Sequence, residues 1–372
     1  MTAKASVAGQ RFMRLALEEA SRGLGRTAPN PAVGAVLVRG GRVIGRGHHA
    51  RAGGPHAEIV ALRQAGAAAR GADLYTTLEP CDHFGRTPPC SVAVIEAGVR
   101  RVFVGSRDPN PLVNGKGTSR LRRAGVEVVA GPLRAECDAL NAPWFRFVAS
   151  GRPFVTLKVA ATLDGRIATA RGGDSRWDPG PEARAEAHRL RDRADAVLVG
   201  AGTARADDPR LTTRLPGGAG RDPLRVVLDT GLRLPATLKL FRQRSAARTL
   251  VLHAAGRERD LGPRVDLQRC ARGPGGLDLG DALARLAARG VVHLLVEGGG
   301  AVAAAFLSAG LVDRLALVLA PRVLGGGLCW SGEAGPARMA EALRLRDLTV
   351  ERLGDDLLLQ GTPVLAATGR RV

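Results

Sequence analysis

The sequence predicts an α/β protein of two domains, each with a layer of strands covered by helices. Three observations support this prediction. The chain has 372 residues, which is long for one domain and comfortable for two. Segments with helical and with strand-like apolar spacing alternate along it, as in layered α/β folds. Near 144–153 the alternation starts again, around Gly151 and Pro153. We therefore expect domains at 1–148 and 149–372.

The first domain is expected to open with a helix over about 10–23, where Phe12, Leu15 and Ala16 recur at helical spacing. Glycines at 40 and 41 then mark a hairpin turn. The expected elements after the first helix are strands at 29–38 and 42–49, a helix at 56–66, a strand at 72–80, a helix at 91–99, a strand at 101–111, and a helix followed by a strand within 117–131.

The second domain is expected to open with two strands within 153–170, joined by Asp164-Gly165, a strong hairpin signal. Asp164 is therefore interpreted as a turn residue and not as a catalytic one. The expected elements that follow are a helix at 181–194, strands at 196–203, 223–229 and 249–253, a helix at 278–289, a strand at 291–297, a helix at 301–309 and a strand at 314–321.

Composition excludes some classes of protein and leaves one alternative open. There is no apolar run of membrane-spanning length and no hydrophobic signal region at the start, so we expect a soluble, cytoplasmic protein. The net charge of +20 resembles that of a nucleic-acid binder. However, the basic residues are mostly arginines spread along the chain, and aromatic residues make up only 3%, too few for a base-stacking platform. We expect anionic small substrates instead.

The segment "EPCDHFGRTPPC", from Glu79 to Cys90, places two cysteines in a proline-rich loop. A disulfide, a metal site and coincidence would each explain them, but a reducing compartment disfavours the disulfide. Upstream, "PHAE" supplies His56 and Glu58 at a helix start. His56, Cys81 and Cys90 make three zinc ligands and leave the fourth position for water, as a catalytic zinc requires. Glu58 is then free to move a proton from that water to a leaving amine.

This pattern matches the H-x-E and P-C-x-x-C signature of zinc nucleoside deaminases, although here eight residues separate the cysteines. In the second domain, "VVHLLVEGGGAVAAAFL" is a strand, three glycines and a helix. A triple glycine alone is more typical of a plain turn, but free amides at a helix start also suit the phosphates of a dinucleotide. The motif is not G-x-G-x-x-G, so a Rossmann domain is not predicted.

Several motifs of the first domain resemble the bifunctional riboflavin-biosynthesis deaminase–reductase family: "TAPNPAVGAVLV", "GRGHHARAGGPHAE", "TLEPCDHFGRTPPC" and "DPNPLVNGKG". The resemblance implies a cytidine-deaminase-like three-layer α/β/α domain, with zinc on the three ligands and Glu58 as proton shuttle. It also implies substrate contacts at Asn30, His49, His83 and Arg86, and a guanidinium at Arg86 suits a phosphate. A loop-stabilising hydrogen bond is the alternative for each. Asp82 departs from the small polar residue usual in the family.

The second domain resembles the same family's reductase, through "LKVAATLDGRIAT", "DSRW", "ADAVLVGAGTARADDPRLTTR", "PLRVVLDT" and "LLVEGGGAVAAAFLSAGLVDRLALVLAPRVLGG". The resemblance implies a dihydrofolate-reductase-like α/β domain that uses NADPH. The implied cofactor contacts are Ala160, Trp177, Thr203, Asp207, Thr230, Gly299, Gly300 and Ala301. The implied substrate contacts are Ser175, Arg191, Leu211, Arg214 and Glu297, with the two arginines as partners of the ribose phosphate.

Some residues of the second domain remain ambiguous or depart from the family. Lys158 either approaches the reacting end or is a solvated strand terminus. The family usually has Ile and then Thr or Ser after Trp177, where this chain has Asp178-Pro179, which we expect to start the next helix. Gly202 replaces the usual Asn, so we expect an active reductase with somewhat weaker NADPH binding. The residues that match no motif, and that we interpret as structural, are His188, His253, His293, Cys137, Cys270 and Cys329.

Together these features predict a two-step enzyme of riboflavin biosynthesis that uses Zn2+ and NADPH. Its first reaction would deaminate 2,5-diamino-6-(ribosylamino)pyrimidin-4-one 5′-phosphate, and its second would reduce the ribosyl group to ribityl. We expect a phosphorylated pyrimidine as substrate, no nucleic-acid or membrane partner, and a homo-oligomer. One rival is a deaminase of tRNA or free cytosine nucleosides with a vestigial or regulatory dinucleotide-binding domain. A binding protein that holds the dinucleotide as a regulator is another.

Overall fold

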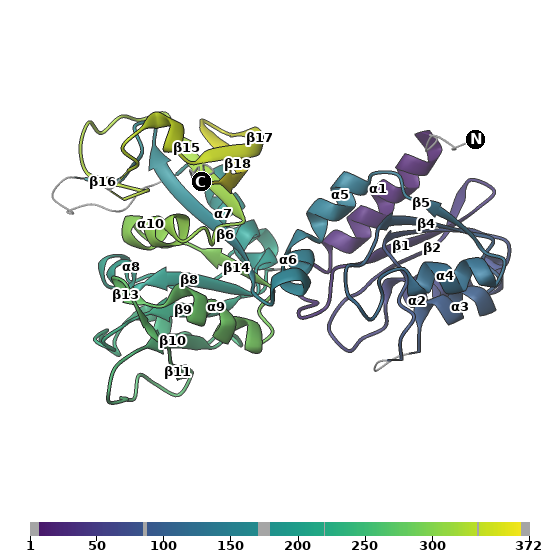
Figure 1. Cartoon of the computed structure of the whole chain (residues 1–372), viewed down its shortest axis with the longest axis horizontal. Helices are drawn as coiled ribbons and strands as arrows, with labels where there is room; N and C mark the ends of the chain where they lie inside the picture. Colours follow the sequence, from purple (N-terminus) through teal and green to yellow (C-terminus); the bar gives the residue numbers. More distant parts are fainter. Residues whose placement is uncertain (1–6, 85–87, 170–178, 219, 333–334, 366–372) are drawn as a thin grey trace, which may run out of the picture. The chain divides into compact units, whose positions relative to one another are not determined.

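Figure 1 shows the chain as a computed structural model that describes residues 7–84, 88–169, 179–218, 220–332 and 335–365. The chain forms two compact units, Met1–Arg152 and Pro153–Val372. The boundary expected after residue 148 falls within a helix that ends at Ser150. In the described part of the chain, no helix has both the length and the apolar character needed to cross a membrane.

The first unit is built on a five-stranded sheet of order β2-β1-β3-β4-β5. β1 is antiparallel to both β2 and β3, while β3, β4 and β5 are parallel. Its elements are α1 (Val7–Ser21), β1 (Gly34–Arg39), β2 (Arg42–His48), α2 (Ala57–Ala65), a 3-10 turn (Gly66–Ala69), β3 (Asp73–Leu78), α3 (Cys90–Glu96), β4 (Arg101–Ser106), α4 (Lys116–Arg123), β5 (Glu127–Ala130), α5 (Arg134–Leu140) and α6 (Ala142–Ser150).

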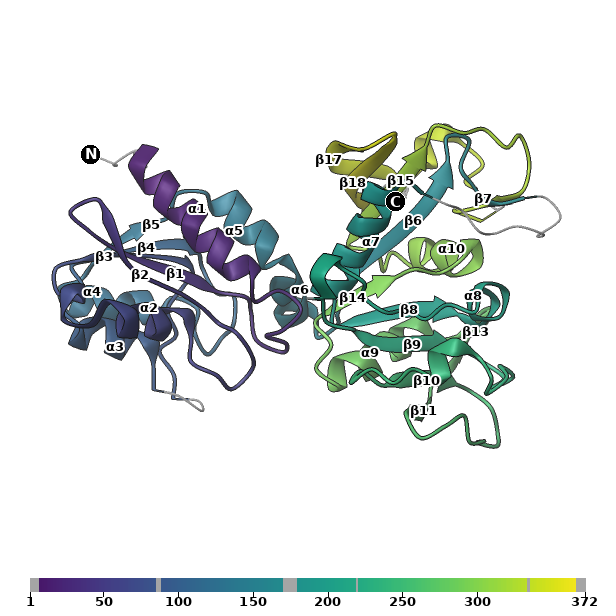
Figure 2. The same ribbon diagram turned by 180° about the vertical axis from the view of Figure 1, so that it is seen from behind.

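Helices cover both faces of this sheet, so the unit has three layers (Figures 1 and 2). Because side chains alternate along a strand, β1 contributes to both cores. Ala35 and Leu37 pack with the helices α2, α3 and α4, whereas Val36 and Val38 pack with α1 and α5. The predicted three-layer arrangement is confirmed, and so is the hairpin of β1 and β2.

The second unit contains a nine-stranded sheet of order β11-β10-β9-β8-β14-β6-β15-β18-β17. The strands from β11 to β15 in this order are parallel, and β18 and β17 are antiparallel to their neighbours.

The elements of the main sheet and its helices are β6 (Phe154–Thr162), α7 (Pro181–Arg193), β8 (Ala196–Gly200), α8 (Ala201–Asp207), β9 (Leu224–Leu228), β10 (Thr249–His253), β11 (Val265–Arg269), α9 (Leu279–Ala288), β14 (His293–Val296), α10 (Gly300–Ser308), β15 (Arg314–Ala320), β17 (Arg344–Leu353) and β18 (Asp356–Val364). Smaller pieces are β7 (Arg166–Ala168), β12 (Arg272–Gly273), β13 (Gly276–Leu277), β16 (Leu328–Cys329) and 3-10 turns at Pro216–Gly218, Lys239–Phe241 and Met339–Glu341.

Helices also cover both faces of this larger sheet. α9 and α10 pack on one face through Leu283, Leu286 and Phe306, while α7 and α8 lie on the other. The carboxyl ends of four parallel strands, β6, β8, β9 and β14, lie along the same side of the sheet. In open α/β sheets, ligands bind outside these carboxyl ends. This edge therefore gathers the segments that follow those strands, including the three glycines after β14.

Two expectations about local structure are wrong. The Asp164-Gly165 turn forms, with the Gly165 N–H donating to the Thr162 carbonyl at 2.9 Å, but β7 pairs with β16 and not with β6. α7 begins at Pro181, with Gly180 as its N-cap, and not at Asp178-Pro179. The Gly180 N–H donates to the Asp356 carboxylate at 2.8 Å, and this bond fixes where the helix starts. The helices α5, α6 and α8 and the strands β11, β17 and β18 were not foreseen.

Each unit has its own core, so fragments 1–152 and 153–372 should fold separately. We expect each purified fragment to show helical and strand circular dichroism and a cooperative thermal transition. Cutting between 148 and 149 would remove the last two residues of α6, so that pair of fragments should be less stable. Two unfolded fragments from the cut after Arg152 would contradict the prediction.

Candidate functional site

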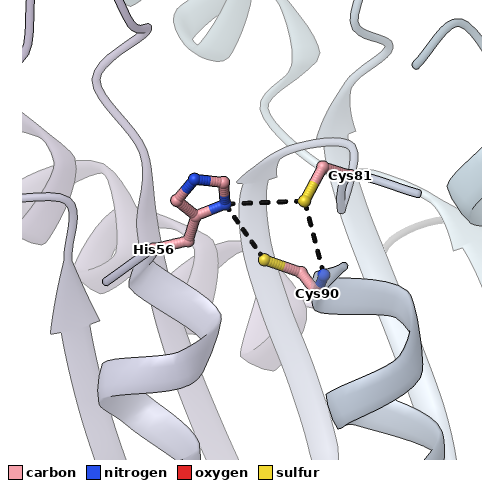
Figure 3. Close-up of side chains that lie close together, drawn as sticks. All are labelled: His56, Cys81 and Cys90. Carbon is pink, nitrogen blue, oxygen red and sulfur yellow. Dashed lines mark hydrogen bonds between the residues drawn. The ribbon is translucent and has the colours of Figure 1, made fainter. Parts of the chain in front are cut away.

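The three predicted zinc ligands lie together at the start of two helices (Figure 3). His56 is the N-cap of α2, Cys90 is the first residue of α3, and Cys81 lies in the loop that follows β3. His56 Nδ1 lies 3.2 Å from Cys90 Sγ and 3.5 Å from Cys81 Sγ. All three donor atoms lie within 4.8 Å of one another. The structure thus brings together residues from three separate segments of the sequence.

The donor set fits zinc in both chemistry and spacing. A tetrahedral zinc with Zn–S near 2.3 Å and Zn–N near 2.0 Å places its N and S ligands about 3.5 Å apart. The two N–S distances here are close to that value. A set of one imidazole and two thiolates also favours zinc over the oxygen-seeking magnesium and calcium ions. Three protein ligands leave one position for water.

One of the two thiols, that of Cys81, is poised to give up its proton. Hydrogen bonding from Cys90, together with His56, lowers the pKa of Cys81 to about 4. The Cys90 N–H also donates to Cys81 Sγ at 3.3 Å. The pKa of Cys90 is raised, because its thiol donates to Cys81 and is buried. One thiolate is therefore already present at neutral pH, as metal ligation requires.

Glu58 lies in the first turn of α2 and is only 3% exposed. Burial raises the pKa of its carboxyl above the usual value, with the neighbouring Cys81 adding to the effect. A carboxyl whose pKa is raised toward neutrality both accepts and returns protons readily. Glu58 faces the same cavity as His56 and Cys81.

That cavity has a volume of about 380 Å³ and is large enough for a pyrimidine ring. Asn30, His49 and His83, for which substrate contacts are expected, line it. His49 Nδ1 lies 3.0 Å from the Pro55 carbonyl, which can only accept, so Nδ1 carries the proton. Nε2 then accepts from the Asn30 amide at 3.2 Å, and burial lowers the pKa of His49, which keeps the ring neutral. His83 Nδ1 is buried with no partner among the described residues.

The cavity also contains residues that we had not singled out. Its wall includes Glu79, Asp108, Asn110 and Trp144. Asp108 and Asn110 belong to the "DPNP" motif, so their residue types could have flagged them as polar groups after a strand. Nothing in the sequence around Trp144 indicated a place in this site.

Two acidic residues near the zinc ligands have structural partners. Glu79 accepts the N–H groups of Gly115 and Thr118 at 3.0 and 3.2 Å, which caps α4 and joins it to the end of β3. Asp82 accepts the Ser91 hydroxyl at 2.5 Å and pairs with Arg120. The unusual Asp82 thus has its charge balanced next to the thiolates.

The second candidate site lies at the edge of the large sheet. The Gly299 N–H donates to Thr203 Oγ1 at 2.9 Å, which joins the start of α10 to α8. The first-turn N–H groups of a helix have no intrahelical partners, and here they belong to Gly300, Ala301 and Val302. Ala301 is exposed. These amides can therefore hold an anion such as a pyrophosphate.

Close packing requires glycine just before α10, at Gly298, and at its first residue, Gly300. A Cβ on Gly298 would lie 2.6 Å from Val302, and one on Gly300 would overlap the Cys329 carbonyl oxygen. In contrast, a Cβ on Gly202 in α8 would meet nothing within 4 Å. The replacement of the family's Asn at 202 therefore leaves space that an amide side chain could occupy.

A buried ion pair lies beside this edge. Arg191 binds Glu297 through two hydrogen bonds, Nε to Oε1 at 2.8 Å and NH2 to Oε2 at 2.6 Å. Arg191 NH1 also donates to the Thr212 carbonyl at 3.0 Å. The side chains of Arg191 and Glu297 are only 14% and 9% exposed. Three of the five guanidinium N–H groups are thus engaged within the protein.

Lys158 lies inside β6 and is half-buried, so it is not a solvated strand terminus. β6 and β14 are parallel, with Leu157 opposite Val296, and the next register position places Lys158 beside Glu297. Burial lowers the pKa of its ammonium, although Glu297 opposes this effect. The remaining alternative, that Lys158 approaches the reacting end, agrees with this position.

The other expected residues of this site are placed as follows. Leu211 is buried with φ of 52°, and the exposed Arg214 donates to Thr212 Oγ1 at 3.0 Å. Ala160 lies near the end of β6, Asp207 ends α8, and Thr230 follows β9. Arg86, Ser175 and Trp177 lie outside the described residues.

The remaining histidines and cysteines have structural surroundings. The Arg214 N–H donates to His188 Nδ1 at 3.3 Å, and burial lowers the pKa of His188 to about 4. His293 contacts Thr156 Oγ1 at 2.9 Å. His253 and Cys137 are fully buried, Cys270 is buried, Cys329 is partly exposed, and all five cysteines are free.

Alanine at 300 and at 202 should have opposite effects. Gly300→Ala should lower the free energy of unfolding by about 1–3 kcal/mol, because the methyl group forces the backbone apart. Gly202→Ala should be neutral or stabilise by up to about 1 kcal/mol, because alanine favours the helix. Urea unfolding of both variants measures the difference. Equal stabilities would contradict the packing argument.

Comparison with known proteins agrees with both candidate sites. Residues 7–106 match the model of the cytidine and deoxycytidylate deaminase zinc-binding region, and residues 153–359 match the model of the RibD C-terminal domain. The chain is 42% identical over 352 residues to the riboflavin biosynthesis protein RibD of Aquifex aeolicus, covering 94% of this chain and 96% of that protein. It is 38% identical over 362 residues to the RibD of Escherichia coli, covering 94% of this chain and 97% of that protein.

Solved structures agree as well. The chain superposes on a diaminohydroxyphosphoribosylaminopyrimidine deaminase/5-amino-6-(5-phosphoribosylamino)uracil reductase from Thermotoga maritima with a TM-score of 0.86 at 38% identity, covering 96% of this chain and 99% of that one. These matches confirm the predicted fold class and function, and they do not support the nucleoside-deaminase rival, which left the second domain unexplained. The chain belongs to the RibD family of bifunctional deaminase–reductases of riboflavin biosynthesis.

Proposed function

We propose that the first unit, with its expected extent of 1–148, deaminates a phosphorylated 2,5-diaminopyrimidinone, and that the second, 149–372, reduces the product. The observation that carries the first assignment is the cluster of His56, Cys81 and Cys90 beside the buried Glu58. The buried Arg191–Glu297 pair beside the amides of α10 supports the second.

In the deaminase site, the three ligands would hold zinc, which when bound supplies the Lewis acidity that makes hydroxide available from water near neutral pH. Glu58 takes a proton from the attacking water and delivers it to the departing amine, so that ammonia leaves. Asn30, His49 and His83 orient the ring: the Asn30 amide is fixed by His49, and His83 Nδ1, which has no partner among the described residues, offers a hydrogen-bonding group. Arg86 pairs with the substrate phosphate.

In the reductase site, NADPH when bound supplies the hydride that reduces C1′ of the ring-opened ribosyl group. The amides of Gly300 and Ala301 hold its phosphates, and the Thr203–Gly299 bond orients that turn. Ala160, Trp177, Asp207 and Thr230 complete the cofactor contacts. A Zn2+ ion and NADPH are thus the two cofactors of the proposal.

The residues proposed to contact the substrate in the reductase site have different roles. The exposed Arg214 is the principal phosphate partner, while Arg191 uses its two remaining N–H groups and keeps Glu297 ionised. Leu211 packs beneath this segment, and Ser175 completes the set. Lys158, which lies next to Glu297, would interact with the substrate at its reacting end.

The proposal predicts two coupled observations on one protein sample. Mixing the enzyme with the diaminopyrimidinone phosphate should release ammonia, and adding NADPH should then cause a loss of its absorbance. Ammonia release without NADPH oxidation would reject the reductase assignment, and NADPH oxidation only with pre-deaminated substrate would reject the deaminase assignment.

Replacing Glu58 should separate proton transfer from metal binding. Glu58→Gln should lower the deaminase turnover by at least about 10²–10⁴-fold while zinc content stays at one per chain, because the amide cannot carry the proton. Elemental analysis and ammonia release measure the two quantities. Cys81→Ser is the matched comparison, and it should lose zinc and deamination but keep reduction of pre-deaminated substrate. Zinc loss in Glu58→Gln would instead make Glu58 a ligand.

Restoring the amide at position 202 should strengthen NADPH binding. Gly202→Asn should lower the NADPH dissociation constant by up to about tenfold, the effect of one hydrogen bond of about 1 kcal/mol. Gly202→Ala controls for the helix, because it adds a Cβ without an amide. Fluorescence titration with NADPH gives the constants. If Asn binds NADPH no more tightly than Ala, the open space at 202 does not adjoin the cofactor.

A further inference from the structure

The last helix of the first unit brings an aromatic side chain into the deaminase cavity. Trp144 lies in α6, and its indole Nε1–H donates to Asp108 Oδ1 at 3.1 Å. Both residues line the cavity that contains His56 and Glu58. They are 36 positions apart in sequence, so only the fold brings them together.

Asp108 is held in a defined orientation. It lies two residues beyond the end of β4 and is 5% exposed. The Asn110 N–H donates to the same oxygen, Oδ1, at 2.9 Å. Both donors bind Oδ1, and no described residue donates to the second oxygen, Oδ2, which can accept a hydrogen bond from a ligand in the cavity.

The charge on Asp108 depends on these donors. Burial raises the pKa of its carboxyl, and Glu79 adds to this, whereas the bonds from Asn110 and Trp144 and the neighbouring His83 lower it. A carboxylate with few donors in such a place would take up a proton and lose an acceptor. The indole N–H is an effective donor because its position is fixed by a rigid ring.

Trp144 is not a fully buried core residue. None of the residues of α6 is buried, and the nearest aromatic contact of Trp144 is with Phe147, at 6.4 Å between ring centroids. Trp144 is half-buried, like most residues of α6, and it contributes its indole N–H to the cavity.

We propose that Trp144 is a positioning residue of the deaminase site, which holds the Asp108 carboxyl group oriented to accept a hydrogen bond from an N–H or O–H group of the pyrimidine substrate. Trp144 acts through Asp108 and does not itself touch the reacting atoms. This inference rests on the proposed deamination in this cavity.

The variant Trp144→Phe keeps the ring and removes the donor. We expect the KM for deamination to rise about tenfold with less than a twofold change in turnover, because the contact to the substrate is weakened equally before and during the reaction. The pKa of Asp108 should rise without the donor. Since binding needs the carboxylate, the acidic limb of kcat/KM should move to higher pH by up to roughly one unit.

A double-mutant cycle tests the route of the effect. Asp108→Asn still accepts from the indole but presents an amide N–H to the substrate, so it should raise KM by itself. Adding Trp144→Phe to Asp108→Asn should then change KM by less than twofold. Phe147→Leu is the matched control, because it alters the neighbouring ring and leaves the indole N–H in place, and its KM should remain near that of the parent. Zinc content and the thermal transition of the first unit report on the integrity of each variant.

The outcomes separate this inference from the proposed function. Retention of full deamination in Glu58→Gln would overturn the site itself. An inactive Glu58→Gln together with an unchanged KM and pH profile in Trp144→Phe would overturn only the role of Trp144. Trp144→Phe and Phe147→Leu could instead raise the KM equally, and by the same factor in the Asp108→Asn background. That result would show that α6 acts through packing, and it would also overturn the role of Trp144.

Discussion

The deaminase site depends on how closely α2 approaches β2. Gly45 and Gly47 face this helix, and a Cβ on either would overlap the carbonyl groups of Ala61 and Ala57. Both alanines are fully buried. The helix backbone therefore rests directly on the strand, with no side chain between them. Because His56 and Glu58 lie at the start of this helix, the glycines fix the distance of both residues from the sheet, and a metal site tolerates errors of only about 0.5 Å.

The second unit also positions a helix start by close packing against glycine, but for a different chemistry. Gly300 lies against the Cys329 carbonyl, so the first turn of α10 is close to β16. In both units, a helix start is held at a strand edge by residues without large side chains. In the first, the helix start presents a metal ligand and a carboxyl, and in the second it presents bare amides. A chain with 49 glycines and few aromatic residues is well suited to this kind of packing.

Sequence patterns predicted those parts of the structure that depend on near neighbours. Apolar spacing placed α2, α3 and α10, and the motifs around His56, Cys81 and Cys90 predicted a cluster that the fold assembles. What the sequence did not reveal depends on distant residues. The Asp164-Gly165 pair specifies a turn but not the partner of β7, which comes from Leu328–Cys329.

The start of α7 shows the same limit. Pro179 and Pro181 each suit the first turn of a helix, and the choice is made by Asp356, 176 positions away, which accepts the Gly180 N–H. Likewise, only the register of β6 with β14 places Lys158 beside Glu297, and only the fold of α6 brings Trp144 to Asp108. Local signals identify the residue types of a site, but its second layer of contacts comes from tertiary structure.

The carboxyl groups of the two sites differ in a way that matches their chemistry. Glu58 is buried near Cys81 and Cys90, and burial raises its pKa, which favours the protonated carboxyl more than in water. Glu297 is also buried, but Arg191 and Lys158 outweigh that burial and lower its pKa. Groups whose surroundings shift their pKa values in opposite directions are suited to different roles. Glu58 is therefore suited to carry a proton in hydrolysis. Glu297 remains a fixed negative charge, suited to hold a substrate group or the Lys158 ammonium in place while a hydride is transferred.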